Sequence, residues 1–186
     1  MATRGRIAIK ENGKYRYVYN HYDSYIDSLG VTLFKYYKDA DTVRALINLG
    51  NLSSVGITVD NNASCYKEHI ALENLKTKGT VAFFREGRIW KDFDYYKPDE
   101  DWENCKPTEV DTLEEVLNVK EVLGEEFVYI FDVEENKWYM AYNREAFELK
   151  DLDVMLHTSD NVKRYAELIG IAEQYKQAFY DRCLNA

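Results

Sequence analysis

The sequence predicts an α+β fold, in which an antiparallel sheet built from hairpins carries packed helices and a long C-terminal helix. Three observations lead to this prediction. Three pairs of short β-prone runs are each joined by a turn signal, helical periodicity lies between them, and a long amphipathic stretch closes the sequence. Strands linked as hairpins favour antiparallel pairing and disfavour a doubly wound parallel sheet.

The first hairpin has the strongest local signal. Residues 4–10 and 15–20 are rich in Ile, Val and Tyr, and Asn12-Gly13 lies between them. An Asn-Gly pair supplies the two positive-φ positions that a type I′ turn requires. Weaker signals of the same kind predict hairpins over residues 80–90 and 127–142.

Helices are predicted where apolar residues recur at intervals of three and four. Thr112 and Glu115 have the spacing of a capping box, in which each side chain bonds the backbone amide of the other residue. Gly50 is placed to end a helix. The predicted helices cover residues 29–37, 41–49, 67–75, 112–123 and 159–184, and loops are predicted over 21–28 and 51–64.

Length and composition favour a single soluble domain over residues 1–186. Of the 186 residues, 46% are hydrophobic and 31% are charged, which is typical of globular proteins. The first ten residues are basic and β-prone, and no apolar run approaches the roughly 18 residues that span a bilayer. The three isolated cysteines indicate free thiols. We expect a cytoplasmic protein with no membrane partner, and the oligomeric state cannot be read from the sequence.

Charge is distributed unevenly along the chain. The formal net charge is −9, yet residues 92–135 alone contain sixteen Asp or Glu and three Lys. A field of that sign steers basic partners and repels nucleic acid, so direct DNA binding through this region is not expected. Two interpretations stay open: a phosphate mimic that occupies the nucleic-acid groove of another protein, or a face that serves solubility.

Aromatic residues within the acidic segment suit a protein interface. The chain has sixteen tyrosines, although sheet packing also explains them, since Tyr favours strands. Replacing Asp99, Glu100, Asp101 and Glu103 by Lys is expected to abolish binding at this interface. The predicted partner-binding residues are Asp92, Asp94, Tyr95, Tyr96, Asp99, Glu100, Asp101, Trp102 and Glu103.

A second candidate site lies in the loop after the first hairpin. His21 and Asp23 are two residues apart, and such a pair can perform acid–base chemistry or hold a metal. A third ligand is not visible, and a structural role in the loop is the simpler explanation. As a ligand-binding loop, the site would supply rings for stacking and arginines for phosphate. Its residues would be Arg4, Arg6, His21, Tyr22, Asp23 and Tyr25.

The sequence contains no familiar catalytic motif. Walker A, GxGxxG, GxSxG, HExxH and CxxC patterns are all absent. With three histidines and three isolated cysteines, the chain can form few of the nucleophile–base pairs that catalysis commonly uses. We therefore predict a protein that is not an enzyme, with no catalytic residue, no cofactor and no bound metal.

Residues 3–56 carry a distinctive pattern. Thr-Arg precedes an Ile-containing strand, a loop of the form Tyr-x-His-x-Asp-x-Tyr follows, and Leu-Ile-x-x-Gly-x-x-Ser-Ser ends the pattern. It resembles a family of small uncharacterised phage and prophage proteins. This chain has Tyr22, Ser24 and Asn51 where that family usually has Trp, Gly and Asp. The matching residues are Thr3, Arg4, Ile7, Tyr19, His21, Asp23, Tyr25, Gly30, Leu33, Val43, Leu46, Ile47, Gly50, Ser53 and Ser54.

The resemblance implies a phage context in a bacterial host, where small proteins without enzyme motifs often bind host defence proteins. The first hypothesis is therefore an inhibitor of a host nucleic-acid-binding protein, such as an anti-CRISPR protein that acts on a Cas nuclease through the acidic surface. An alternative is a protein that sequesters a small ligand or signalling nucleotide in the loop at residues 21–25. A further alternative is a metal-dependent enzyme that uses His21 and Asp23.

Overall fold

The first two strands form the predicted hairpin. The structure is a computed structural model that describes residues 3–59, 80–82, 105–119, 124–143 and 149–186. In it, β1 (Arg4–Glu11) pairs antiparallel with β2 (Lys14–Asn20). Asn12 and Gly13 have φ angles of 53° and 73°. Two successive positive φ values are the requirement of a type I′ turn, so the Asn-Gly prediction is confirmed.

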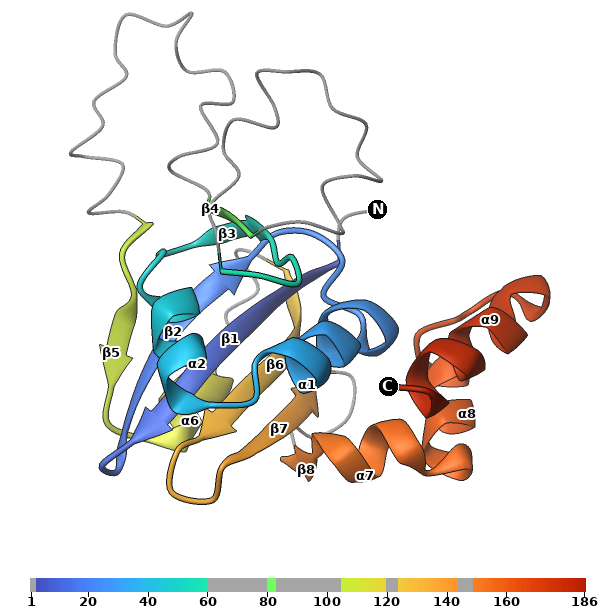
Figure 1. Cartoon of the computed structure of the whole chain (residues 1–186). Helices are drawn as coiled ribbons and strands as arrows, with labels where there is room; N and C mark the ends of the chain where they lie inside the picture. Colours follow the sequence, from blue (N-terminus) through green and yellow to red (C-terminus); the bar gives the residue numbers. More distant parts are fainter. Residues whose placement is uncertain (1–2, 60–79, 83–104, 120–123, 144–148) are drawn as a thin grey trace, which may run out of the picture.

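The strands of the described residues join in one sheet (Figure 1). Its order is β4-β3-β2-β1-β6-β7-β8, and β5 pairs antiparallel with β2 over Tyr15–Tyr17. β6 and β7 form the hairpin that the sequence predicts over residues 127–142, and Asn136 in its turn has a φ of 52°. The bounds are β3 (Leu52–Ser54), β4 (Val81–Ala82), β5 (Thr108–Val110), β6 (Glu125–Asp132), β7 (Lys137–Tyr142) and β8 (Lys150–Asp151).

The sheet is mixed, so the prediction of a purely antiparallel sheet is wrong. β1 runs parallel to β6, and β2 runs parallel to β3. Turn signals reveal only the pairing of strands that are adjacent in sequence. The β1–β6 pair joins distant segments. Its two ion pairs, the buried Arg6–Glu125 and the part-buried Lys10–Asp132, link residues 119 and 122 positions apart. No local pattern could predict that pairing.

Most helices cover one face of the sheet (Figure 1). A single π-turn, η1 (Ile26–Gly30), leads directly into α1, so this helical segment begins earlier than its predicted start at residue 29. Gly50 follows α2 with a φ of 76°, as the sequence predicts. The helices of this face are α1 (Val31–Tyr36), α2 (Ala40–Ile47), α7 (Leu152–His157), α8 (Ser159–Leu168) and α9 (Glu173–Leu184).

The C-terminal stretch forms two helices where the sequence predicts one. Gly170 has a φ of 71°; its amide donates to the Glu167 carbonyl at 3.0 Å, and the Ile171 amide donates to the Ala166 carbonyl at 2.8 Å. This pair of bonds is a Schellman motif, which ends α8 at a left-handed glycine. The apolar periodicity continues on both sides of the break, which is why periodicity alone predicts a single helix.

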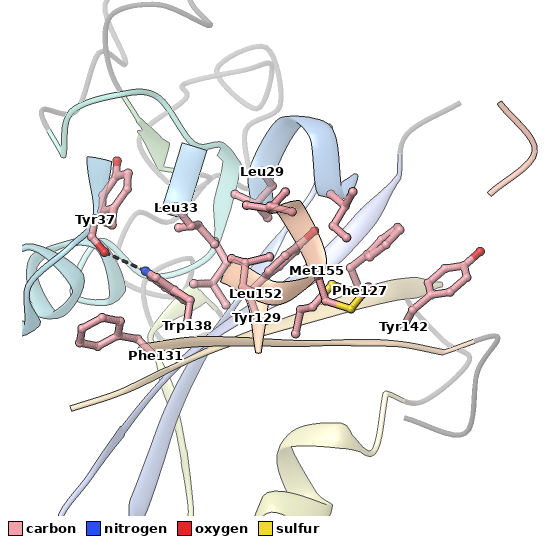
Figure 2. Close-up of a cluster of buried hydrophobic side chains, with 14 of the residues drawn as sticks. Leu29, Leu33, Tyr37, Phe127, Tyr129, Phe131, Trp138, Tyr142, Leu152 and Met155 are labelled. Atoms are coloured by element: carbon pink, nitrogen blue, oxygen red, sulfur yellow. Dashed lines mark hydrogen bonds between the residues drawn. The ribbon is translucent and has the colours of Figure 1, made fainter. Parts of the chain in front are cut away.

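The two faces of the sheet carry two separate apolar clusters. The larger cluster lies between the strands and the helices, and Figure 2 shows its side chains pointing from the strands toward those helices. The smaller cluster lies on the opposite face, against α6 (Leu113–Leu117). It contains Ala8, Val116, Val128, Ile130 and Ala141. We call these two sides the helix face and the α6 face.

Other local predictions have mixed outcomes. The Thr112–Glu115 capping box is confirmed, although α6 ends at Leu117 rather than near residue 123. β3 lies within a segment that the sequence predicts as a loop, because its residues, Leu52-Ser53-Ser54, have little strand character. Cys105 and Cys183 are buried free thiols. The predicted helix over 67–75 and most of the predicted hairpin over 80–90 lie outside the described residues.

Candidate functional site

The loop at residues 21–25 is held by backbone hydrogen bonds to two separate segments. The amides of His21 and Tyr22 donate to the carbonyls of Leu52 and Ser53, each at 3.0 Å. The Ser24 amide donates to the Thr3 carbonyl, also at 3.0 Å. The loop is therefore fixed between the start of β1 and β3, although nothing in its own sequence predicts this order.

Two buried polar side chains support the loop from below. Asn20 and Ser24 are both fully buried. The side-chain amide of Asn20 donates through Nδ2 to the Tyr22 carbonyl at 2.7 Å and to Ser24 Oγ at 2.8 Å. The hydroxyl of the buried Tyr129 donates to the Ser24 carbonyl at 2.9 Å. Buried hydrogen bonds of this kind rigidify a structure. The loop presents His21, Tyr22 and Asp23 from a preorganised base.

Asp23 occupies a left-handed backbone conformation. Its φ is 56°, which only a few per cent of non-glycine residues adopt, although Asp tolerates it better than most. Such positions persist where the surrounding structure determines them, and they concentrate at functional sites. Asp23 lines a small cavity of about 50 Å³ together with Ser28, Thr32 and Ser54. The cavity is large enough for about one water molecule and collects one carboxylate with three hydroxyl groups.

Three aromatic rings meet at the start of the loop. The Tyr19 hydroxyl lies 2.8 Å from His21 Nδ1, and the His21 and Tyr22 rings are 4.3 Å apart, edge to face. All three side chains are half-buried. Partial burial raises the pKa of Tyr19, so its hydroxyl keeps its proton and can donate to the imidazole. These rings form the aromatic part of the predicted ligand loop.

The structure does not bring all six predicted loop residues together. Arg6 is buried and bonds Glu125 through two contacts at 3.1 and 2.9 Å, so it serves the sheet rather than the loop. Tyr25 packs edge-on against Phe127 in the core at 6.0 Å between ring centroids. Arg4 remains near the rings, close enough to act electrostatically on Tyr19. The candidate ligand loop therefore reduces to Arg4, Tyr19, His21, Tyr22 and Asp23.

The described residues offer no third ligand for the metal centre that His21 and Asp23 would need. Among them, no three side chains of His, Cys, Asp or Glu are grouped as metal ligands would be. The His21 ring is also occupied by the Tyr19 hydroxyl on one nitrogen. What this loop can do chemically is stack against a flat group and offer a hydrogen bond from the imidazole.

The structure describes part of the acidic segment at residues 92–135. The predicted partner-binding residues, from Asp92 to Glu103, lie outside the described residues. The described part of the segment holds nine acidic residues and one lysine, and six of those nine carboxylates are exposed. Glu125 and Asp132 are buried in the sheet as partners of Arg6 and Lys10. A simple charge count therefore overstates the acidic surface of this region.

Exposed carboxylates gather at the end of the sheet where the β1–β2 and β6–β7 turns lie. The Asn12 amide donates to Glu134 Oε1 at 2.7 Å, which joins the two turns. Lys14 lies 3.5 Å from Asp111, which joins the first turn to the end of β5. We name this region the turn-end surface and define it as Glu109, Asp111, Glu114, Glu134 and Glu135.

A shallow hollow of about 400 Å³ opens beside the turn-end surface. It lies between β2 and β5 and is lined by Glu109, Asp111, Tyr15 and Arg16, with Glu11 at its edge. Glu11 accepts a hydrogen bond from Arg44, and this bond lowers the pKa of the carboxylate against the opposing effect of burial. Sequence reasoning missed this grouping, because it depends on the parallel β1–β6 pairing that aligns the two turns.

Comparison with known proteins gives no further guidance. The chain matches no protein-family model, no curated protein and no solved structure. The resemblance to phage proteins therefore stays a prediction. In the described part of the chain, no helix has the length and apolar character that crossing a membrane requires.

Proposed function

We propose that this protein is a phage-encoded, non-catalytic inhibitor that binds a basic surface on a host nucleic-acid-binding protein, such as a CRISPR nuclease. The observation that supports this proposal is the turn-end surface. Its five carboxylates are exposed, come from three different parts of the chain, and lie around two adjoining turns. Spaced carboxylates on one surface can occupy sites where a partner otherwise binds phosphate.

Hydrogen bonds hold the backbone segments that carry these carboxylates. Glu109 lies on β5, which pairs with β2 over Tyr15–Tyr17. Glu114 lies within the complete Thr112–Glu115 capping box, and Glu134 accepts a hydrogen bond from the Asn12 backbone amide. A rigid acidic surface loses little conformational entropy when it binds, which favours association.

Little within the described residues neutralises these carboxylates. The Lys14–Asp111 pair is long, and both side chains are more than three quarters exposed, at 77% and 79%. Exposed pairs of this kind contribute about 0–1 kcal/mol, so a partner's lysine or arginine can replace Lys14 easily. Tyr15 and Tyr139 lie half-buried on the adjacent α6 face and could contribute apolar contact area at the edge of an interface.

The test is affinity capture from a bacterial lysate that contains Cas9 and guide RNA, at low and high salt and with nuclease treatment. We expect a nucleic-acid-binding protein to be retained after nuclease treatment and released by salt, because screening at physiological ionic strength acts over about 8 Å. The purified partner should then lose activity when this protein is added. Double replacement Glu109→Lys with Asp111→Lys should weaken binding and inhibition together.

The matched control reverses two exposed acids on the C-terminal helices, Glu167→Lys with Asp181→Lys. It changes the net charge by the same amount at a distant surface. Equal loss in the two double variants would show that only net charge matters. Undiminished inhibition by the Glu109 and Asp111 variant would contradict the role of the turn-end surface, and the reversal at residues 99–103 would then test the rest of the acidic segment.

A second candidate function is supported by the preorganised loop at residues 21–25. Half-exposed rings of Tyr19, His21 and Tyr22, with Arg4 nearby, suit a ligand that has a flat base and a phosphate. A nucleotide that binds only the folded state raises the unfolding temperature by mass action. We expect such a shift in a panel of signalling nucleotides, and its loss in Tyr22→Ala.

Tyr36→Ala provides the control for the loop, since Tyr36 is 48% exposed and lies on α1. A nucleotide that stabilises Tyr22→Ala as strongly as the parent protein binds elsewhere. Absence of any shift across the panel would leave the acidic-surface proposal as the sole candidate of the two.

A further inference from the structure

A cavity on the helix face is separate from both surfaces discussed above. It has a volume of about 240 Å³ and lies between α1, the β6–β7 turn, β8 and the start of α7. None of its lining residues belongs to the turn-end surface or to the loop at residues 21–25. Its chemistry divides into an aromatic wall and a charged rim.

The aromatic wall is formed by Phe34, Phe131 and Trp138. The Phe131 and Trp138 rings meet edge to face with centroids 5.2 Å apart. Trp138 Nε1 donates to the Tyr37 carbonyl at 2.7 Å, as the dashed line in Figure 2 shows. This bond satisfies the one polar group of the indole. Trp138 is 5% exposed, so the surface that its ring offers to the cavity is small and apolar.

The acidic members of the rim are already bonded within the fold. Asp151 accepts from Lys137 at 3.1 Å through Oδ2 and from the Asp153 amide at 2.9 Å through Oδ1, which caps α7. Asp153 Oδ1 lies 2.6 Å from His157 Nδ1. Asp151 is therefore paired with the Lys137 ammonium, whereas Asp153 is 64% exposed and stands at the outer rim of the cavity beside His157.

The basic members of the rim retain hydrogen-bonding capacity. Lys38 is exposed, and the structure gives it no ion pair within the described part of the chain. Lys137 uses one of its three N–H donors on Asp151, which leaves two. The Lys137 pKa is raised by the bond to Asp151, so the ammonium stays charged. Two ammonium groups thus flank an aromatic wall.

From this arrangement we propose that the cavity binds a small aromatic anion, a single ring that carries one carboxylate or phosphate group. The ring would lie against Phe34 and Trp138, and the anionic group would lie between Lys38 and Lys137. The volume is below the roughly 300–1,000 Å³ of sites for drug-sized ligands, so one ring with one charged group is the fitting size. This site is independent of the proposed inhibitory function.

The test is titration of the ¹⁵N-labelled full chain with benzoate, followed by NMR through the Trp138 indole and Lys38 amide signals. For a ligand of this size we expect a Kd of about 1 mM. Benzamide keeps the ring without the charge, and acetate keeps the charge without the ring, so both should bind at least several-fold more weakly. Replacement of the exposed Lys38 by Ala should weaken benzoate binding roughly tenfold, the usual effect of losing a charged hydrogen bond.

Lys163→Ala is the matched control, because Lys163 is an exposed lysine on α8 outside the cavity. It should bind benzoate like the parent protein. The proposal is overturned if benzoate leaves the Trp138 signal unmoved, if benzamide binds equally well, or if Lys38→Ala and Lys163→Ala behave alike. In the last case the anion responds only to general surface charge.

Discussion

The two faces of the sheet are stabilised by different kinds of interaction. On the helix face, three aromatic side chains donate to backbone carbonyls: Tyr37 to Gly56, Tyr129 to Ser24 and Trp138 to Tyr37. On the α6 face, a small apolar cluster is flanked by charged pairs that cross between β1 and β6. The helix face is an apolar core with isolated polar anchors, and the α6 face depends on charge pairing.

The charged pairs lie at two levels of the parallel β1–β6 pairing. Arg6–Glu125 lies toward the N-terminal end of both strands, and Lys10 is the register partner of Asp132 toward their other end. A shift of β1 by one residue would move Arg6 and Lys10 to the helix face, away from Glu125 and Asp132. We infer that these pairs select the register of the central strands, whereas the helix face supplies most of the burial.

The largest expected effect comes from breaking the buried pair on the α6 face. Arg6 bonds Glu125 twice, donates to the Val116 carbonyl at 2.7 Å, and lies 4.2 Å over the Tyr17 ring. Arg6→Ala leaves Glu125 buried without its partner, and such losses cost about 3–5 kcal/mol. Urea unfolding followed by circular dichroism should show this drop in the free energy of unfolding.

A double replacement separates pairing from burial. Arg6→Met with Glu125→Leu removes both charges while keeping apolar volume, and similar exchanges are often neutral or stabilising by about 1–4 kcal/mol. We expect the double variant to be clearly more stable than Arg6→Ala. A double variant that is as unstable as Arg6→Ala would show that the bonds to Val116 and Tyr17, not the charge pair, provide the stability.

The same contrast explains how much of the fold the sequence predicts. The β1–β2 hairpin, the β6–β7 hairpin and the Thr112 capping box follow from residues close in sequence, and all three are confirmed. The parallel β1–β6 pairing depends on contacts across 119 positions or more, for which turn chemistry gives no signal. The break at Gly170 was readable in principle, because a glycine after an amphipathic stretch is a helix-ending signal.

The candidate sites show the same limit. The sequence predicts that His21 and Tyr22 belong to one site, and they do lie together because they are neighbours in one loop. It predicts the same of Arg6 from its charge, yet the Arg6 side chain lies on the α6 face and bonds Glu125. Asn20 and Ser24, which hold the loop, give no sequence signal of this role, since burial of a polar side chain depends on distant segments such as Tyr129.

An intermediate effect is expected where the loop meets the sheet. A Cβ placed on Gly5 would lie 2.8 Å from Ser24 Cβ and Oγ, and 3.0 Å from the Phe127 carbonyl oxygen. All three contacts involve a backbone atom or the fully buried Ser24 side chain, so little can move. Gly5→Ala should lower the free energy of unfolding by about 1–3 kcal/mol, the range for overpacking. Thermal unfolding of the variant measures this change.

A second variant identifies the cause of that loss. Ser24→Gly removes the Cβ and hydroxyl that Gly5→Ala would strike, at the cost of the bond from Asn20. If the clash with Ser24 dominates, the double variant should be more stable than the sum of the two single losses predicts. Strict additivity would instead assign the loss to the contact with the Phe127 carbonyl.

The smallest effect concerns the second charged pair, and it depends on pH. Burial alone would raise the pKa of Asp132, but the hydrogen bond from Lys10 and the Glu135 amide outweigh it and hold that pKa below 3.8. The bond to Asp132 raises the pKa of Lys10 above 10.5. The pair therefore stabilises the fold between these limits. Its contribution is lost as the pH falls through the folded pKa of Asp132 or rises through that of Lys10.

Asp132→Asn tests this pair because it keeps the shape of the side chain and removes its charge. We expect a loss of about 1–2 kcal/mol at neutral pH, the contribution of a hydrogen bond to a charged group with a partly exposed partner. Unfolding free energies measured at successively lower pH should converge for parent and variant as the pH falls through the folded pKa of Asp132, because the side chain is then protonated in the parent too. A difference that persists undiminished at acid pH would mean that Asp132 acts through its bond to the Glu135 amide, at 3.1 Å in the β6–β7 turn, rather than through Lys10.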